Sequence, residues 1–422
     1  FLQDVLGKKD ALNVVDVIVG GPPCQAFARI GRAKLRAVMD HPQAYLQDER
    51  AVLYIRFLEY VEFFRPLAVL VENVPDILNY GNTNIAEEIA SSLDDLGYRC
   101  AYTLLNAAHY DVPQYRLRFF LLAFRSDLSL TPVFPQPTRY AEVPDGYRSG
   151  RAVAMKGLHN GQLSLNIPVN HFTETPPADQ NLPPAVTAQQ AIGDLPRIFD
   201  HLQRHTGRGG GAHSFDRLVP YPMDTTISAY AKDMRSWPGF EAGKGVFDHV
   251  IRYLPRDYPI FQAMHHGDEY PQAHDIAMRH YHEELSRLQD ETGQVIDPDS
   301  QEGQLLRKRI VPPYPVEKFP NKWWKICPDA PVRTLTAHIG KDTYTHIHYD
   351  SDQARIISVR EAARLQSFPD GFVFTGPMND AFRQIGNSVP PLLAYALAKQ
   401  IYHQLQDVGY VPPEPDPPTS AE

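Results

Sequence analysis

Short apolar runs alternate with amphipathic stretches over the first 125 residues of the chain. In the amphipathic stretches, 50–64 and 85–96, apolar residues recur at the spacing of a helix. The apolar runs have the length and the β-branched and aromatic content of strands, and they cover residues 14–19, 67–71, 100–105 and 118–124. Because strands that alternate with helices are typical of a doubly wound sheet, the sequence predicts an α/β fold here.

This alternation fades near residue 126, where prolines accumulate. Residues 199–330 are rich in histidine, proline, tyrosine and glycine, and the glycine run at 207–211 predicts a hinge. The end of the chain, residues 411–422, is proline-rich and acidic and is predicted to be a disordered tail. Helices are predicted at 275–288, 360–367 and 391–404.

The chain has 422 residues, of which 43% are hydrophobic and 22% are charged, as in soluble globular proteins. No apolar run approaches the roughly 20 residues that cross a bilayer, so no membrane partner is expected. The three cysteines, Cys24, Cys100 and Cys327, are too few and too scattered for a disulfide framework. This cysteine content favours a reducing compartment, and we expect the protein in the cytoplasm.

A formal net charge of −9 argues against general binding to polyanions, because nonspecific affinity for nucleic acid comes mainly from lysine and arginine. A surface that binds DNA must therefore be locally basic. Arg307-Lys308-Arg309 and the spaced Lys318, Lys322 and Lys325 are candidates, although a solvated surface is the commoner role of such residues. Nine of the 17 histidines lie within residues 201–282, but their spacing does not match a zinc module, and no metal site is predicted.

The segment Gly20-Gly21-Pro22-Pro23-Cys24-Gln25 directly follows the first predicted strand. It places Cys24 at the carboxyl end of a buried strand, where open α/β sheets present reactive groups. The prolines stiffen the backbone and the glycines permit a tight turn. Because a cysteine that only packs needs no such scaffold, Cys24 is predicted to be an exposed and activated nucleophile.

Four more motifs follow this segment in order. They are Glu72-Asn73-Val74, residues 114–118 (Gln-Tyr-Arg-Leu-Arg), residues 360–369 (Arg-Glu-Ala-Ala-Arg-Leu-Gln-Ser-Phe-Pro) and residues 386–391 (Gly-Asn-Ser-Val-Pro-Pro). Together the five motifs resemble the DNA cytosine-C5 methyltransferase family of bacterial restriction-modification systems. The resemblance covers residues 1–198 and 331–402 and implies a Rossmann-like, S-adenosylmethionine-dependent methyltransferase fold with a smaller mixed target recognition domain.

The resemblance implies transfer of a methyl group from S-adenosylmethionine to C5 of a flipped cytosine in a specific sequence of double-stranded DNA. Since C5 is barely nucleophilic, Cys24 would first add covalently at C6. Glu72, with its pKa raised by partial burial, would hold a proton at N3. Arg118 would bind O2 of the cytosine and Arg116 would support the site. We expect both arginines on one face of the fourth strand.

The resemblance also assigns binding residues. The contacts implied for S-adenosylmethionine are Asp4, Pro23, Leu53, Asn387 and Ser388. The contacts implied for DNA lie in and beside residues 26–47, a mobile loop expected to close over the flipped base, and are Gln25, Arg29, Arg32 and Lys34.

The family pattern divides the chain into four parts. Residues 1–198 are predicted to be the first part of the catalytic domain and residues 199–330 the target recognition domain. Residues 331–410 are predicted to return to the catalytic domain, and residues 411–422 are the tail. The glycine-rich Phe-x-Gly-x-Gly turn of the family and the acid that binds the cofactor ribose are not found. The chain by itself is therefore expected to bind S-adenosylmethionine poorly, and an N-terminal segment or subunit that carries this turn is an expected partner.

Three other interpretations remain open. The chain can be a catalytically inactive DNA-binding or regulatory remnant, one subunit of a split methyltransferase, or a tRNA cytosine methyltransferase. The presence of Cys24, Glu72 and Arg118 disfavours an inactive remnant, since a binding module does not need them. The long variable block of residues 199–330 disfavours the tRNA enzyme.

Overall fold

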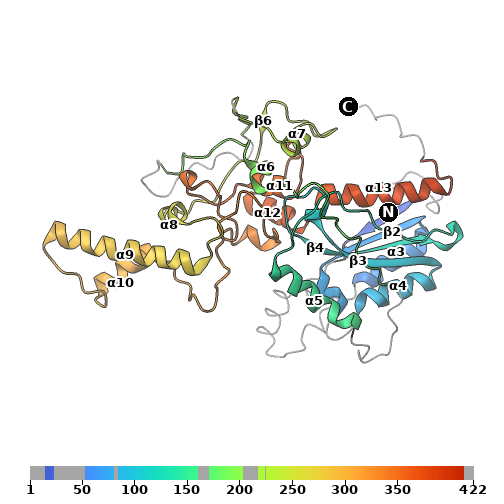
Figure 1. The fold of residues 1–422 in the computed structure, drawn as a ribbon, viewed down its shortest axis with the longest axis horizontal. Helices are drawn as coiled ribbons and strands as arrows, with labels where there is room; N and C mark the ends of the chain where they lie inside the picture. Colours follow the sequence, from blue (N-terminus) through green and yellow to red (C-terminus); the bar gives the residue numbers. More distant parts are fainter. Residues whose placement is uncertain are drawn as a thin grey trace. The chain divides into compact units, whose positions relative to one another are not determined.

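The computed structural model describes residues 15–22, 53–79, 84–159, 171–202, 217–223 and 225–412. The chain forms two compact units (Figure 1). The first comprises residues 1–110, 117–183 and 392–422, and the second comprises residues 111–116 and 184–391. No helix of the described residues is long and apolar enough to cross a membrane.

A four-stranded mixed sheet forms the centre of the first unit. Its strands lie in the order β1 (Val17–Gly20), β2 (Ala68–Asn73), β4 (Leu117–Arg125) and β3 (Tyr98–Asn106). All four strands predicted from the sequence are present, with ends that differ by up to three residues. β1 and β2 are parallel, but β4 is antiparallel to both of its neighbours. The short connection between β3 and β4 explains this difference, because parallel strands need a longer crossover.

Helices α3 (Leu53–Phe64), α4 (Ile85–Asp95) and α5 (Asp145–His159) pack on one face of this sheet. α3 and α4 match the predicted helices closely, whereas α5 is too polar to have been predicted. Helix α13 (Pro391–Asp407) lies on the side of the sheet away from α4 and α5 (Figure 1). The core on the α4 side includes Val61, Ile89, Leu93, Val69, Val71, Tyr102, Phe119 and Leu121.

Strand β1 lies at one edge of the sheet and pairs only with β2 among the described strands. Its side chains Val17 and Val19 are 37% and 67% exposed. At the opposite edge, β3 is covered, since the backbone of Tyr102 bonds to His171 and Thr173. The edge at β1 is therefore open and apolar in the part of the chain that the structure describes.

The second unit is mainly helical. It contains α6 (Ala188–Ile192), α7 (Ala229–Arg235), α8 (Tyr258–Ala263), α9 (Tyr270–Thr292), α10 (Gln301–Ile310), α11 (Val359–Leu365) and α12 (Met378–Asn387), with a short ribbon of β5 (Val219–Pro220) and β6 (Gly245–Val246). The predicted helices at 275–288 and 360–367 correspond to α9 and α11. An aromatic core surrounds Trp323, which stacks on Tyr344 with ring centroids 4.7 Å apart.

The boundaries of these units differ from the predicted domain limits at 198 and 330. Residues 331–391 group with 184–330, and among the C-terminal elements only α13 belongs to the first unit. The physical reason is a set of buried ion pairs. Arg360 binds Asp248 at 3.1 Å and Arg364 binds Asp194 at 3.0 Å, so the segment 360–369 is part of the interior of the second unit.

Replacement of Gly386 tests the packing of α12. A Cβ atom at this position would overlap the backbone of Thr336 and Ala337. We expect Gly386→Ala to lower the free energy of unfolding by about 1–3 kcal/mol, because overpacking forces the backbone apart. In the control Gly150→Ala, the new Cβ meets nothing within 4 Å in α5, and the gain in helix propensity should stabilise the protein by about 0.5–1 kcal/mol. Chemical denaturation measures both effects, and equal effects would contradict the packing described here.

Candidate active site

Glu72 and Arg118 form an ion pair on the sheet of the first unit. Glu72 in β2 lies directly opposite Phe120 of β4, so Arg118, two residues before Phe120, shares its face of the sheet. The Nε atom of Arg118 is 3.2 Å from Oε1 of Glu72, and the two side chains are 13% and 18% exposed. The antiparallel pairing of β2 with β4 therefore brings together two residues that are far apart in the sequence.

The chain that leaves β1 passes close to this pair. Since β1 and β2 are parallel, Gly20 lies beside Val71, and the backbone emerges next to Glu72. A Cβ atom on Gly21 would lie 3.4 Å from Oε2 of Glu72. The side chain of Asn73 donates a hydrogen bond to the carbonyl of Pro22 at 3.4 Å. The segment that leads to Cys24 is thus held beside the Glu72 carboxylate.

Arg116 takes a different position from the one expected. It precedes β4, which begins at Leu117, and it belongs to the second unit. Its buried guanidinium donates hydrogen bonds to three carbonyl oxygens, of Leu335 at 2.6 Å, Gly386 at 2.9 Å and Ser388 at 3.0 Å. The expectation that both arginines lie on β4 is therefore wrong for Arg116, which lies just before the strand and is bound by these carbonyls.

Two glutamine side chains connect three of the sequence motifs, namely residues 114–118, 360–369 and 386–391. Gln114 donates to Oε1 of Gln366 at 2.6 Å and accepts from the amide of Leu335 at 3.0 Å. Gln366 in turn donates to the carbonyl of Ser388 at 2.8 Å and to its hydroxyl at 3.1 Å. Asn387, the last residue of α12, is exposed. These contacts fix the position of Ser388 and leave the Asn387 amide at the surface.

Several predicted site residues lie outside the described residues. They are the nucleophile Cys24, the cofactor contacts Asp4 and Pro23, and the DNA contacts Gln25, Arg29, Arg32 and Lys34, together with the loop 26–47. Leu53 begins α3, but its side chain also lies outside the description. Within the described ranges, no group of three or more His, Cys, Asp or Glu side chains is arranged to hold a metal ion.

The other two cysteines are poor nucleophiles. Burial raises the pKa of the Cys100 thiol well above its usual range, and the neighbouring carboxylate of Asp94 raises it further. Burial also raises the pKa of Cys327. Both residues are therefore thiols rather than thiolates near neutral pH.

Among the basic residues, Lys325 is fully buried and is not available to DNA. Its ammonium group donates to the carbonyl of Phe261 at 2.5 Å and to the hydroxyl of Ser351 at 3.0 Å, and burial lowers its pKa to about 8. Lys322 pairs with Asp342. The run Arg307-Lys308-Arg309 is exposed in the last turn of α10 and remains a candidate for contact with phosphates.

Sequence reasoning missed a buried polar network around Glu361. This glutamate closes the capping box of α11 with Ser358 and accepts two 2.7 Å hydrogen bonds from Arg355. Burial raises the pKa of Glu361, but the charge of Arg355 outweighs burial and leaves the pKa well below its usual range. His348 lies 3.5 Å from the same carboxylate, and burial with the charge of Arg355 lowers its pKa to about 3.

The C-5 cytosine-specific DNA methylase family gives a sequence match over residues 4–195 and 260–403 of this chain. The chain therefore belongs to this family. It is a DNA (cytosine-5)-methyltransferase of the kind found in restriction-modification systems. The match resumes at residue 260, earlier than the limit of 331 expected from the motifs, and it leaves residues 196–259 outside.

Relatives of the chain agree with this assignment. A type II methyltransferase of Oceanobacillus iheyensis is 37% identical over 413 residues, which cover 96% of this chain and 82% of that protein. Type II methyltransferase M.AgeI of Thalassovita gelatinovora is 31% identical over 401 residues, or 92% of this chain and 82% of that protein. The crystal structure of a prophage-encoded DNA modification methyltransferase from E. coli covers 96% of this chain and 82% of that chain, with a TM-score of 0.54 and 19% identity. This likeness confirms the α/β, Rossmann-like methyltransferase fold.

Buried histidines make the second unit sensitive to acid. Burial lowers the pKa of His346 to about 4 and that of His348 to about 3. The unfolded chain binds these protons near pH 6.5, so stability is full above this pH and is lost as the pH falls toward the folded values. All three tryptophans, Trp237, Trp323 and Trp324, lie in the second unit. We expect denaturation followed by tryptophan fluorescence to show a free energy of unfolding that falls by about 1.4 kcal/mol per pH unit for each such histidine.

A substitution isolates one proton of this dependence. In His346→Gln this position no longer titrates. The free energy of unfolding should therefore fall less steeply between pH 6 and pH 4.5, by an amount that corresponds to the uptake of about one proton fewer on unfolding. His171 of the first unit is the control of opposite sign. Burial alone would lower its pKa, but its 2.7 Å contacts with Asp94 and Glu87 raise it. The contribution of His171 to stability is present below pH 6.5 and is lost as the pH rises through its raised pKa. His171→Gln should leave the tryptophan-detected slope unchanged, and an unchanged slope in His346→Gln would refute the assignment.

Proposed function

We propose that this chain methylates C5 of a flipped cytosine in a specific sequence of double-stranded DNA, with S-adenosylmethionine as the methyl donor and a covalent adduct of Cys24 at C6. The observation that carries the proposal is the position of Gly21 and Pro22. These residues, which directly precede the Pro23-Cys24 pair, are held against a carboxylate that Arg118 orients. The nucleophile Cys24 and the acid Glu72 are therefore expected close together, at the carboxyl ends of the adjacent parallel strands β1 and β2.

The proposed chemistry divides between these residues. The Cys24 thiolate forms a bond to C6 of the base, and the displaced electron pair moves toward N3 and C5. Glu72 holds a proton at N3, so the ring is not left with a full negative charge. Arg118 keeps the Glu72 carboxyl in place and is proposed to bind O2 of the cytosine. C5 would then take the methyl group, and the donor would leave as a neutral thioether. Water would accept the C5 proton, and the electron pair of that C–H bond would restore the C5–C6 double bond as the Cys24 sulfur leaves C6 as a thiolate and N3 returns its proton to Glu72.

The donor supplies an electrophilic methyl group when it is bound. Among the described residues, Asn387 and Ser388 are proposed to bind its methionine end. An exposed amide at the end of α12, beside a hydroxyl fixed by Gln366, suits the amino and carboxylate groups of an amino acid. Asp4, Pro23 and Leu53 complete the proposed set. We place the protein in the cytoplasm, where host DNA is accessible.

Arg116 is proposed to act as a positioning residue rather than to contact the base. Its three carbonyl contacts hold the segment that carries Asn387 and Ser388. This role differs from direct support of the nucleophile, and it follows from the full burial of the guanidinium.

We also propose that a segment or subunit that carries the glycine-rich cofactor turn pairs with β1, whose side chains Val17 and Val19 are exposed in the described part of the chain. The proposed reaction is the same in that arrangement.

Substitution of the cysteines tests the mechanism. Cys24→Ala should lower transfer of labelled methyl groups from S-adenosylmethionine to DNA by about 1,000-fold or more, and Glu72→Gln by about 100- to 10,000-fold. Cys327→Ala is the matched control and should keep full activity, because that thiol is protonated. Covalent capture of a duplex that carries 5-fluorocytosine should disappear only in Cys24→Ala. Methyl transfer by Cys24→Ala would rule out the covalent mechanism.

We further propose that residues 199–330 read the target sequence and that the remaining parts carry the catalytic machinery. In support, residues 196–259 lie outside the family match, and the exposed basic run 307–309 lies in this block. Exchange of residues 199–330 for the equivalent block of a methyltransferase with another target should transfer the new specificity. Bisulfite sequencing of plasmid DNA measures the methylated sites. An active chimera that keeps the original site would place recognition elsewhere.

A further inference from the structure

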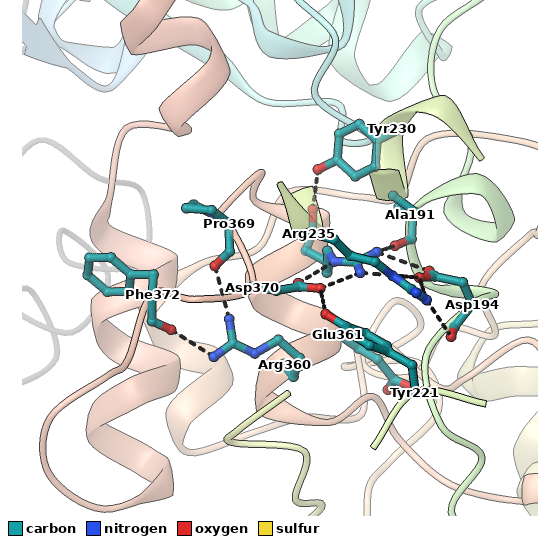
Figure 2. A network of polar contacts seen from close by, with 12 residues as sticks. Ala191, Asp194, Tyr221, Tyr230, Arg235, Arg360, Glu361, Pro369, Asp370 and Phe372 are labelled. Carbon is teal, nitrogen blue, oxygen red and sulfur yellow. Dashed lines mark hydrogen bonds and ion pairs between the residues drawn. The ribbon is translucent and has the colours of Figure 1, made fainter. Parts of the chain in front are cut away.

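A ring of buried charges in the second unit connects α7 with the segment 364–371 (Figure 2). The fully buried Arg364 lies between two carboxylates, with Nη1 at 3.0 Å from Asp194 and Nη2 at 2.5 Å from Asp370. Arg235, the last residue of α7, binds Asp194 through Nε at 3.0 Å and Nη2 at 2.5 Å. The hydroxyl of Tyr221 donates to Asp370. Two arginines and two aspartates thus balance in charge.

Tyr221 and Arg235 also contact each other. The guanidinium carbon of Arg235 lies 3.5 Å from the centre of the Tyr221 ring, which is a close cation–π contact. The two side chains are partly exposed, whereas Arg364, Asp194 and Asp370 are buried. Tyr221 and Arg235 therefore cover the solvent side of the buried charges, and each bonds to a different carboxylate beneath it.

The segment 217–240 that supplies these two side chains has little core of its own. β5 has two residues and α7 has seven. Several of its other connections lead to the same segment 364–371. The carbonyls of Met234 and Phe240 accept from the amides of Asp370 at 2.8 Å and Gly371 at 3.0 Å. The hydroxyl of Tyr230 donates to the carbonyl of Arg364. The segment is therefore attached to residues 364–371 at several points. It is also held by a hydrogen bond from Ser228 to the carbonyl of Gln190 at 2.5 Å and by the pairing of β5 with β6.

The segment has the features of a recognition surface. It lies within residues 196–259, which the family match does not cover. It also exposes large apolar side chains, namely Leu218, Met223, Ile227 and Phe240. A surface of this kind reads a sequence only if it is held in one orientation, because contacts to base edges depend on accurate placement.

We propose that Tyr221 and Arg235 are positioning residues that lock the segment 217–240 onto the buried Arg364 and so determine recognition of the target DNA sequence. This inference rests on the proposed role of residues 199–330 in reading DNA. The lock has one geometry, because a guanidinium that pairs with Asp194 and stacks on Tyr221 cannot satisfy both contacts in another orientation. Loss of either side chain leaves a buried carboxylate with fewer partners and loosens the attachment of the segment.

Kinetics of the full chain test this role. Arg235→Gln and Tyr221→Phe should each raise KM for target DNA by about 5- to 30-fold and increase methylation at sites that differ by one base pair. Their kcat at saturating DNA should stay within about twofold of the unmodified chain. The double substitution should raise KM by less than the product of the two single fold-changes, because both residues act on one network. Arg235→Lys, which keeps the charge but not the paired donors, should restore only part of the affinity.

Arg333→Gln is the matched control. Arg333 also stacks on an aromatic ring, with 4.7 Å to the centre of Trp324, and pairs with a carboxylate, Glu269, in the same unit. Its loss should leave KM for DNA and the methylated sites unchanged. If Arg235→Gln lowers kcat and leaves KM unchanged, the network has a structural role only, and the proposal is refuted.

Hydrogen exchange without DNA separates this inference from the proposed function. Arg235→Gln should speed amide exchange in residues 225–240 by about tenfold or more while α9 stays protected. Faster exchange in a chain that does not methylate DNA would retain the lock but refute its role in DNA recognition. Unchanged exchange in a chain that does methylate DNA would refute the lock and leave the proposed function standing.

Discussion

The second unit depends on the burial of four guanidinium groups. Each of the four side chains is at most 1% exposed, and they belong to Arg116, Arg355, Arg360 and Arg364. Arginine cannot lose its charge in a protein, so each group needs carboxylates or carbonyl dipoles around it. Arg355 finds its partners within six residues, but Arg116 and Arg364 also bind partners that are distant in sequence. Asp194 is 170 positions from Arg364, and Gly386 is 270 positions from Arg116. The charges of Arg116 and Arg364 therefore find all these partners only when distant segments of the unit are assembled, which explains why the motif segments belong to its interior.

Burial of charge also determines how the second unit responds to its surroundings. The histidines in the same interior are held neutral, and the Glu361 carboxylate is held ionised by Arg355. Acid therefore destabilises the second unit in two ways. It protonates histidines that are neutral in the folded state, and it protonates carboxylates that are charged in the folded state. Tyr221 and Arg235 extend the same electrostatics to the surface, where a segment with little apolar core needs an anchor.

In the first unit, strand pairing has the comparable role. The parallel pairing of β1 and β2 brings Gly21 to Glu72, and the antiparallel pairing of β2 and β4 brings Arg118 to the same carboxylate. A shift of either register by one residue would turn one of these side chains to the opposite face of the sheet. The buried apolar residues of β2 and β4 oppose such a shift, so packing of the core protects the geometry of the candidate site.

The sequence by itself determined the elements that local pattern encodes. Apolar spacing predicted the four strands, α3 and α4, and the sequence also predicted helices at the positions of α9, α11 and α13. The motifs are the basis of the chemistry proposed for Cys24, Glu72 and Arg118. Only the tertiary structure decided that the sheet is mixed, that Arg116 faces the carbonyls of Gly386 and Ser388, and that Lys325 is buried. The network of Asp194, Tyr221, Arg235 and Asp370 was not visible in the sequence either. Local spacing specifies which face of an element is apolar, but partners of buried charges are chosen by contacts between distant segments, and no local pattern records those contacts.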